Sequence, residues 1–270
     1  MPRRRPARVG AVLRMAWFWQ LAILVVFLAA WQWVPTIPGA ADVSPVFDRF
    51  FISSPTRVAK TLYDLCTGAH DTQTMWSAFF KSIIPAIVGT AIAVVVGALA
   101  GLICSNWESL NRVVRPFLVM LNALPRITLI PIVIVIAGPT ATANIIIGFL
   151  VVFFLVFFNA YEGGVSVPDE ALENLRILGA GPTELLRKVR WPYVMAWTFA
   201  QLPNAIAFGI TAIVTAELFG GAQGLGRLLL VSVQTANADL TVAVAVVLGG
   251  VSLVLIGLGG YVRNRVLHWQ

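Results

Sequence analysis

The sequence predicts an all-α, polytopic membrane protein with six transmembrane helices. Of its 270 residues, 59% are hydrophobic and only 11% are charged, and the mean hydropathy is +0.85. Soluble domains carry about 25% charged residues. Long runs without charge also recur along the chain. Together these observations indicate that most of the chain folds in lipid.

Spanning about 30 Å of hydrocarbon takes about 20 helical residues. Five runs of suitable length contain no Asp, Glu, Lys or Arg, and a sixth is interrupted only by Arg126. A segment in lipid must satisfy its own backbone hydrogen bonds, and none of the runs alternates like a barrel strand. We therefore expect helices over Trp17–Val34, Ile83–Cys104, Pro116–Ala137, Pro139–Tyr161, Trp191–Ala216 and Leu240–Tyr261.

The first run is expected to remain in the protein as a helix. Its 18 residues exceed the ~7–15 of a signal-peptide core, and no convincing small-x-small cleavage site follows. Tryptophans at both ends are typical of interfacial anchors. We assign residues 1–52 to the basic N-terminal segment, this helix and the start of the external connector. Residues 53–270 then form the transmembrane core.

The distribution of basic residues predicts that both termini are cytoplasmic. With the N-terminus inside, 13 of the 19 Lys and Arg residues fall in inner segments, which is the positive-inside bias. Scattered over several loops, these residues explain the net charge of +7 without nucleic-acid binding. We expect a multi-pass protein of the cell (inner or plasma) membrane. The basic residues expected outside are Arg49, Arg57, Lys60, Lys81 and Arg227.

Two packing features are expected before the third span. In the external connector, "SPTRVAKTLYDL" predicts an amphipathic helix, because Val58, Leu62 and Leu65 recur at helical spacing. In the second span, Gly97 and Gly101 stand four residues apart. This spacing favours the close approach of a neighbouring helix.

The third span contains "NALPRITLIP", with a charge inside the membrane. Counted along a straight helix from Phe117, Arg126 would lie about 14 Å deep, near the bilayer midplane. A charge there costs about 2.5–3.5 kcal/mol, so it should face a wet or polar interior. Prolines 125 and 131 would loosen the helix. We predict that Asn122, Pro125, Arg126 and Pro131 line a translocation path and that Arg126 attracts a small anion. A buried structural ion pair is the alternative.

Between the fourth and fifth spans lies a cytoplasmic segment, about residues 162–191. It contains "ENLRILGAGPTELLRKVRWP". A short helix is expected from Asp169 to Gly179, where glycine can adopt the positive φ that closes a helix. Gly181 and Pro182 then begin a second short helix. The apolar face of the first helix is expected to comprise Leu172, Leu175 and Leu178.

This segment resembles the cytoplasmic loop of permease subunits of binding-protein-dependent ABC importers. That loop has the pattern E-A-A, three residues, G, nine residues, then I-x-L-P. Glu173, Gly179 and Pro192 hold the matching positions here, with every spacing kept. The departures are Asn174 and Leu175 for the two alanines and Trp191 for leucine.

The resemblance covers about residues 53–270 and is greatest to the nitrate, sulfonate and taurine type of permease. Further stretches that carry it are "SSPTRVAKTL", "LNALPRITLIPIVIVIAG" and "TAELFGGAQGLGRLL". It implies a type I ABC importer permease architecture with a translocation path. It also implies that the loop couples to an ATPase through Glu173, Gly179, Ala180, Gly181, Val189 and Pro192. The resemblance does not supply the role of Arg126; it is this arginine that favours a small anion of the sulfonate, nitrate, taurine or carboxylate class as the solute.

The resemblance further implies the partners of the chain. These are two cytoplasmic ABC ATPase subunits that bind ATP and Mg, a second copy or a related permease, and an extracytoplasmic solute-binding protein. The chain lacks the phosphate-binding G-x-x-x-x-G-K-[ST] motif and the hydrolase motifs G-x-S-x-G and H-E-x-x-H. We therefore expect a transport subunit, not an enzyme, with no cofactor or metal of its own. An ion-coupled secondary transporter or channel is the alternative.

The end of the fifth span combines an acid with a glycine-rich loop. Glu217 precedes "LFGGAQGLG", and so many glycines beside a nearly buried acid favour a flexible segment. We predict an outer gate of Glu217, Gly224 and Gly226 on which the binding protein lands, with the Glu217 carboxylate bound to backbone amides of the loop. A purely structural cap is the alternative.

Overall fold

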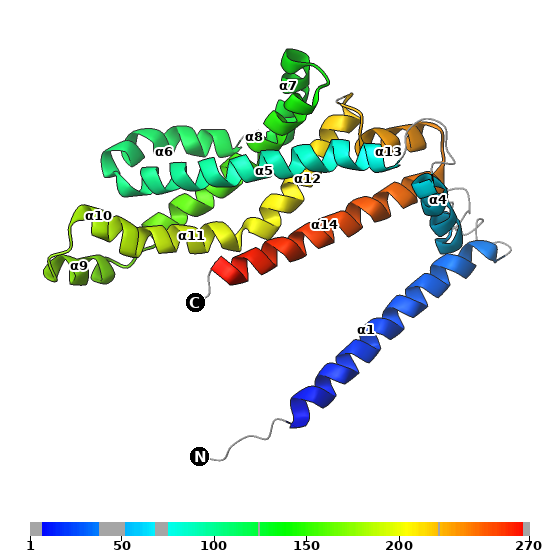
Figure 1. The fold of residues 1–270 in the computed structure, drawn as a ribbon, viewed down its shortest axis with the longest axis horizontal. Coiled ribbons are helices and arrows are strands. Elements are labelled where there is room, and N and C mark those ends of the chain that lie inside the picture. The colour runs from blue at the N-terminus through cyan, green and yellow to red at the C-terminus, as the bar shows by residue number, and fades with distance from the viewer. Residues whose placement is uncertain (1–6, 38–51, 68–74, 124, 221, 267–270) are drawn as a thin grey trace. The chain divides into compact units, whose positions relative to one another are not determined.

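The protein is entirely helical wherever its structure is described. The computed structural model describes residues 7–37, 52–67, 75–123, 125–220 and 222–266, and every regular element in these ranges is a helix (Figure 1). The predicted all-α class is confirmed. The chain divides into two compact units. The smaller comprises residues 1–69 and 232–243, and the larger comprises residues 70–231 and 244–270.

Four helices are long and apolar enough to cross a membrane unbroken. They are α1 (Ala7–Trp33), α5 (Met75–Asn106), α8 (Ala141–Val165) and α14 (Ala238–Val266). Two more crossings are bent pairs. The first, bent by 76°, joins α6 (Glu108–Ala123) to α7 (Leu129–Ala137), and the second, bent by 50°, joins α11 (Trp191–Ala200) to α12 (Leu202–Leu218). The six predicted spans are thus present when each bent pair counts as one.

The third predicted span is not the straight helix that the sequence suggested. Pro125 is extended (φ −63°, ψ 105°), and Arg126 begins a 3₁₀ turn, η3 (Arg126–Thr128). Pro131 lies in the first turn of α7, where a missing amide hydrogen removes no intrahelical bond. Two expectations were therefore wrong: Pro131 does not loosen a continuous helix, and the depth of Arg126 cannot be counted from Phe117.

The smaller unit contains the amphipathic helix predicted in the external connector. This helix, α4 (Pro55–Thr67), buries Val58 and Leu65, as the spacing predicted. A short 3₁₀ turn, η1 (Val34–Thr36), follows α1. At the start of α14, Asp239 accepts a hydrogen bond from the Ser53 hydroxyl at 2.5 Å and pairs with Arg57 at 3.6 Å. The smaller unit therefore satisfies one basic residue of the predicted outer side with an acid of its own. Residues 1–6 and 38–51, which include basic residues counted for topology, lie outside the described ranges.

The core of the larger unit is the contact between α5 and α8. A Cβ atom at Gly101 would lie 2.6 Å from the Cβ of Ala160, and one at Gly97 would lie 3.1 Å from the backbone nitrogen of Phe157. A side chain at either position would therefore push the helices apart. The close approach predicted from this glycine pair is confirmed.

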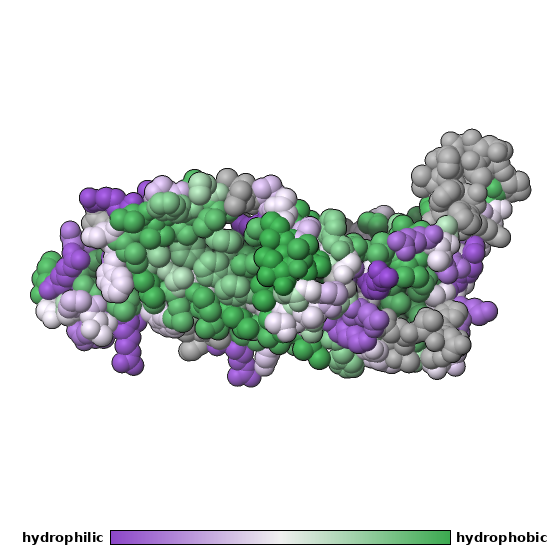
Figure 2. All heavy atoms as spheres, turned by 90° about the horizontal axis from the view of Figure 1, so that it is seen from above, coloured by the Kyte–Doolittle hydropathy of each residue, from purple (hydrophilic) through white to green (hydrophobic). Residues whose placement is uncertain are grey.

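The two ends of the larger unit carry different short helices. In Figure 1, α9 (Asp169–Ile177) and α10 (Pro182–Leu185) lie at one end, and α13 (Leu225–Gln234) lies at the other. Figure 2 shows a broad hydrophobic surface over the middle of the face in view and hydrophilic residues toward the end with α9 and α10. Large apolar side chains of the larger unit are exposed, such as Val135 at 85%. This arrangement suits a bundle surrounded by lipid.

Candidate functional site

The loop predicted to be cytoplasmic begins with a helix that ends in a Schellman motif. Gly179 has φ +84°, the positive value predicted for it. Its amide donates to the carbonyl of Arg176 at 2.9 Å, and the amide of Ala180 donates to the carbonyl of Leu175 at 3.0 Å. These are the two bonds that define the motif. The end of α9 is therefore fixed by local backbone geometry that favours glycine.

The rest of the loop packs back against α9. Gly181 caps α10 with an ordinary extended backbone (φ −77°, ψ 170°), and a π-helical turn, η4 (Leu186–Arg190), follows. Leu172 of α9 and Val189 of η4 are buried in one small apolar cluster. The Arg190 guanidinium donates to the carbonyl of Ser105 at the end of α5, at 2.7 Å. The loop is thus a compact unit attached to the bundle.

The tip of this loop exposes two large apolar side chains. Ile177 is 82% exposed and Leu178 is 81% exposed. The expectation that Leu178 shares the buried face with Leu172 was wrong, because Leu178 is the C-cap and lies beyond the last helical residue. Glu173 is exposed on α9, and Pro192 lies in the first turn of α11. The predicted loop residues therefore form one structure with an apolar end.

Arg126 lines a cavity of about 460 Å³. Pro125 also lines it, whereas Pro131 is not among its lining residues. Asn122 lies in α6, but its side chain is outside the described part of the structure. Two residues that the sequence reasoning missed, Thr211 and Thr215 of α12, complete the polar part of the wall. Their spacing of four residues within an apolar run was the available signal.

Glu217 lies in a buried polar cluster at the opposite end of the larger unit from the loop. It is 0% exposed, and its carboxylate accepts a bond from the Ser82 hydroxyl at 2.8 Å and from the Gly226 amide at 2.7 Å. The Leu225 amide in turn donates to the Ser82 oxygen at 2.8 Å. We call Ser82, Glu217, Leu225 and Gly226 the Glu217 latch. The latch ties the start of α13 to α5 and α12.

The structure shows some of the contacts that were predicted for the outer gate. The expected bond from a loop amide to Glu217 is confirmed, and a Cβ atom at Gly224 would collide with the Glu217 carboxylate. The three predicted residues thus lie together, while their gating role stays a prediction. Ser82 was missed, because nothing in the sequence marks a partner 135 residues away.

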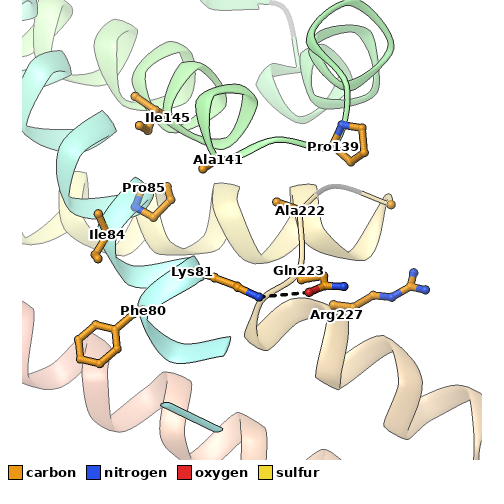
Figure 3. A pocket seen from close by; sticks show the side chains of 11 residues that line it. Phe80, Lys81, Ile84, Pro85, Pro139, Ala141, Ile145, Ala222, Gln223 and Arg227 are labelled. Atoms are coloured by element: carbon orange, nitrogen blue, oxygen red, sulfur yellow. Dashed lines mark hydrogen bonds between the residues drawn. The ribbon is translucent and has the colours of Figure 1, made fainter. Parts of the chain in front are cut away.

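A second cavity, of about 850 Å³, adjoins the latch. We call it the outer cavity. Figure 3 shows Lys81 of α5 reaching toward Gln223, whose side-chain oxygen accepts a hydrogen bond from the Lys81 ammonium at 3.1 Å, with Arg227 of α13 beside them. Phe80, Ile84, Pro85, Pro139 and Ile145 supply apolar walls. Neither cation was predicted as a site residue.

None of the candidate sites has the residues to hold a metal ion. Within the described ranges, no three His, Cys, Asp or Glu residues are grouped closely enough. Cys66 and Cys104 are free thiols, and Cys104 is buried in a helix contact. The chemistry that the sites offer is charge and hydrogen bonding.

Comparison with known proteins identifies the family. Residues 93–268 match the family model described as "Binding-protein-dependent transport system inner membrane component". The "Probable ABC transporter permease protein" of Haemophilus influenzae is 25% identical over 87% of this chain and 91% of its own. The riboflavin transport system permease protein RibX of Chloroflexus aurantiacus is 23% identical over 92% of this chain and 88% of its own. The taurine transport system permease protein TauC of Escherichia coli is 25% identical over 90% of this chain and 87% of its own.

These matches agree with the helical bundle and with the resemblance seen in the sequence. Permeases of this kind are non-enzymatic transport components that work with ATPase and solute-binding partners. The family model covers more than half of the chain. The chain therefore belongs to the binding-protein-dependent transport system inner membrane components and is a multi-pass permease subunit of an ABC importer.

Proposed function

We propose that this permease subunit forms the translocation path for a small anion of the sulfonate, nitrate, taurine or carboxylate class. The observation that carries the proposal is the position of Arg126 in the wall of the 460 Å³ cavity. Small-ligand sites commonly have volumes of about 300–1,000 Å³. The cavity is therefore large enough for a solute of this class.

The chemistry of the cavity favours an anion. Among its described lining residues, Arg126 alone is charged. The hydroxyls of Thr211 and Thr215 donate to backbone carbonyls of their own helix at 2.9 and 2.7 Å. Arg126 therefore supplies both the positive charge and a planar set of N–H donors that matches carboxylate, sulfonate or nitrate oxygens. The break at Pro125 also supports the proposal, because irregular backbone at membrane depth is tolerated where it lines a cavity or is buried in protein.

The names of the relatives are compatible with an anion but do not select one. TauC is named for taurine, which carries a sulfonate, whereas RibX is named for riboflavin. Relatives with similar coverage therefore differ in solute. For this chain, the assignment of an anion rests on Arg126.

We also propose that the loop from Glu173 to Pro192 couples the chain to its ATPase. The compact packing of α9 against η4 supports movement as one body, and the exposed Ile177 and Leu178 suit insertion into an apolar groove of a partner. Burying such a side chain contributes about 1.5–3 kcal/mol. Ala180 and Gly181 continue the turn from Gly179 into α10.

The proposed complex contains two permeases, identical or related, and two cytoplasmic ATPase subunits that bind ATP and Mg. An extracytoplasmic solute-binding protein delivers the anion to the outer gate at Glu217, Gly224 and Gly226. The Glu217 latch supports this role, because it connects the glycine-rich loop to two membrane-spanning helices.

Uptake into proteoliposomes tests the proposal. The liposomes contain the chain with its ATPase and enclosed ATP, and the binding protein is added outside with labelled taurine, nitrate or choline. We expect ATP-dependent uptake of taurine or nitrate that persists when ionophores collapse ion gradients. Preferential uptake of choline would overturn the assignment of an anion. Uptake that needs no ATP and stops with ionophores would instead support the secondary transporter.

A further inference from the structure

The outer cavity brings together two of the five basic residues expected on the outer side. Lys81 comes from α5 and Arg227 from α13, and both line the same 850 Å³ space (Figure 3). No Asp or Glu occurs among the described residues that line it. Its walls are otherwise largely apolar. The cavity therefore combines two positive charges with hydrophobic surface.

The positions of both cations are set by the Glu217 latch. Lys81 directly precedes Ser82, which bonds to the Glu217 carboxylate and to the Leu225 amide. Arg227 directly follows Gly226, whose amide bonds to the same carboxylate. Each cation is thus one peptide bond away from a buried contact. The latch therefore fixes the backbone next to both charged residues, although they are far apart in the sequence.

The hydrogen-bonding capacity of this pair is largely unused. Arg227 has no hydrogen-bond or ion-pair partner within the described ranges, and the Lys81 ammonium bonds only to the neutral Gln223 amide there. An ammonium has three donors and a guanidinium has five. Two neighbouring cations with no acid among the described lining residues repel one another, so a negative group placed between them would be strongly favoured. The described part of the cavity is therefore complementary to an anion.

We propose that the outer cavity receives an acidic side chain of the extracytoplasmic solute-binding protein. This inference rests on the proposed function, since it requires that a binding protein docks on the outer face. A carboxylate from the binding protein would lie between Lys81 and Arg227, and apolar residues flanking it would contact Phe80, Ile84 and Ile145. Interfaces of this kind combine an apolar core with complementary charges.

Two other sources of an anion fit the structure less well. The outer cavity shares no lining residue with the cavity at Arg126, so a solute bound there would not lie in the proposed path. The anionic surface known to attract basic segments is that of the cytoplasmic leaflet, whereas Lys81 and Arg227 are expected on the outer side. An anionic lipid headgroup is therefore less expected at these outer cations.

The test measures association of the purified binding protein with the complete transporter in nanodiscs of phosphatidylcholine alone. The variant carries Lys81→Gln and Arg227→Gln. We expect the association rate constant to fall about tenfold at low salt and its dependence on ionic strength to become shallower. The matched control is Arg57→Gln, because Arg57 is another outer basic residue but already pairs with Asp239. This control should associate like the wild type.

A second experiment identifies the partner residue. Arg227→Glu is combined with a set of binding-protein variants that each change one surface acid to lysine, and one of these should restore association. Co-purification of the ATPase and unchanged basal ATP hydrolysis show that each permease variant is folded.

Three results would overturn the proposal. The first is an unchanged association rate and salt dependence in the double glutamine variant while wild-type uptake proceeds, which leaves the proposed function intact. The second is normal association with weaker taurine or nitrate uptake, which would place solute in the cavity. The third is a wild-type transporter that does not bind its binding protein at all, which would contradict the proposed function as well.

Discussion

Replacing Gly179 by valine tests whether the coupling loop needs its observed backbone conformation. At φ +84° a β-branched residue is strained by about 1–3 kcal/mol. The chain can avoid this strain by giving up the Gly179–Arg176 and Ala180–Leu175 backbone bonds, at about 0.5–1.5 kcal/mol each. Both routes cost a similar amount. No atom lies within 4 Å of a Cβ atom built at this position, so no collision adds to it.

This cost converts directly into affinity for the ATPase. If the partner binds only the observed loop conformation, about 1–3 kcal/mol weakens binding about 5- to 150-fold. The assay titrates the purified ATPase against Gly179→Val and wild-type chains in nanodiscs. Gly181→Val is the matched control. Gly181 also has open space around it, but its backbone is extended, which valine adopts without strain, and it makes no side-chain capping hydrogen bond that the substitution could remove. We expect the control to bind within about twofold of wild type.

Two observations would refute the reasoning about the loop. One is wild-type affinity of Gly179→Val for the ATPase at equal membrane levels. The other is equal weakening by both valine variants, which would indicate that side-chain bulk matters there instead of backbone conformation.

The remaining predictions concern the Arg126 cavity, the Glu217 latch and the α5–α8 contact. Arg126→Gln should insert and keep its ATPase while uptake of labelled taurine or nitrate falls about tenfold or more, with Arg126→Lys partly active; unchanged uptake would remove Arg126 from the path. Glu217→Gln weakens a charge-assisted contact worth about 1.5–3 kcal/mol, so stimulation of ATP hydrolysis by the binding protein should fall; full stimulation and uptake would contradict a charged gate. Gly101→Leu should destabilise the α5–α8 contact by at least about 1–3 kcal/mol, measured as a lower melting temperature in detergent, and an unchanged value would show that the helices can separate freely.

The crossings and the backbone structure of the loop around Gly179 were predictable because their signals are local. A run of apolar residues long enough to span lipid defines a helix without reference to its neighbours. The loop is equally local, since the bonds that close α9 join residues three and five positions apart. The error at Leu178 is also a local one. The predicted apolar face of α9 included Leu178, but the helix ends at Ile177. Beyond that residue the side chains no longer recur at helical spacing.

The bends and the Ser82 contact of the latch could not be predicted in the same way. Within an apolar run, hydropathy gives no sign of whether a helix is continuous, and Pro125 and Pro203 were compatible with both outcomes. The structure places Pro203 in the first turn of α12, directly after the break. The contact of Ser82 with Glu217 joins distant parts of the chain and depends on how α5 and α12 pack. Tertiary packing therefore decides the Ser82 contact, and apolar composition alone does not show where a helix bends.

Helix α5 gives the subunit a mechanical connection between its two ends. Near one end, the carbonyl of Ser105 is held by Arg190 of the loop, and near the other, Ser82 is held by Glu217. Ser82 and Ser105 are 23 residue steps apart, which corresponds to about 35 Å along the unbroken helix. A movement of the loop can thus be transmitted to the Glu217 latch through α5 alone. It need not pass through the bent α11–α12 pair. No residue of α5 is among the described residues that line the Arg126 cavity. If the loop couples to the ATPase and the cavity carries the solute, as proposed above, force and solute would follow separate routes through the same subunit.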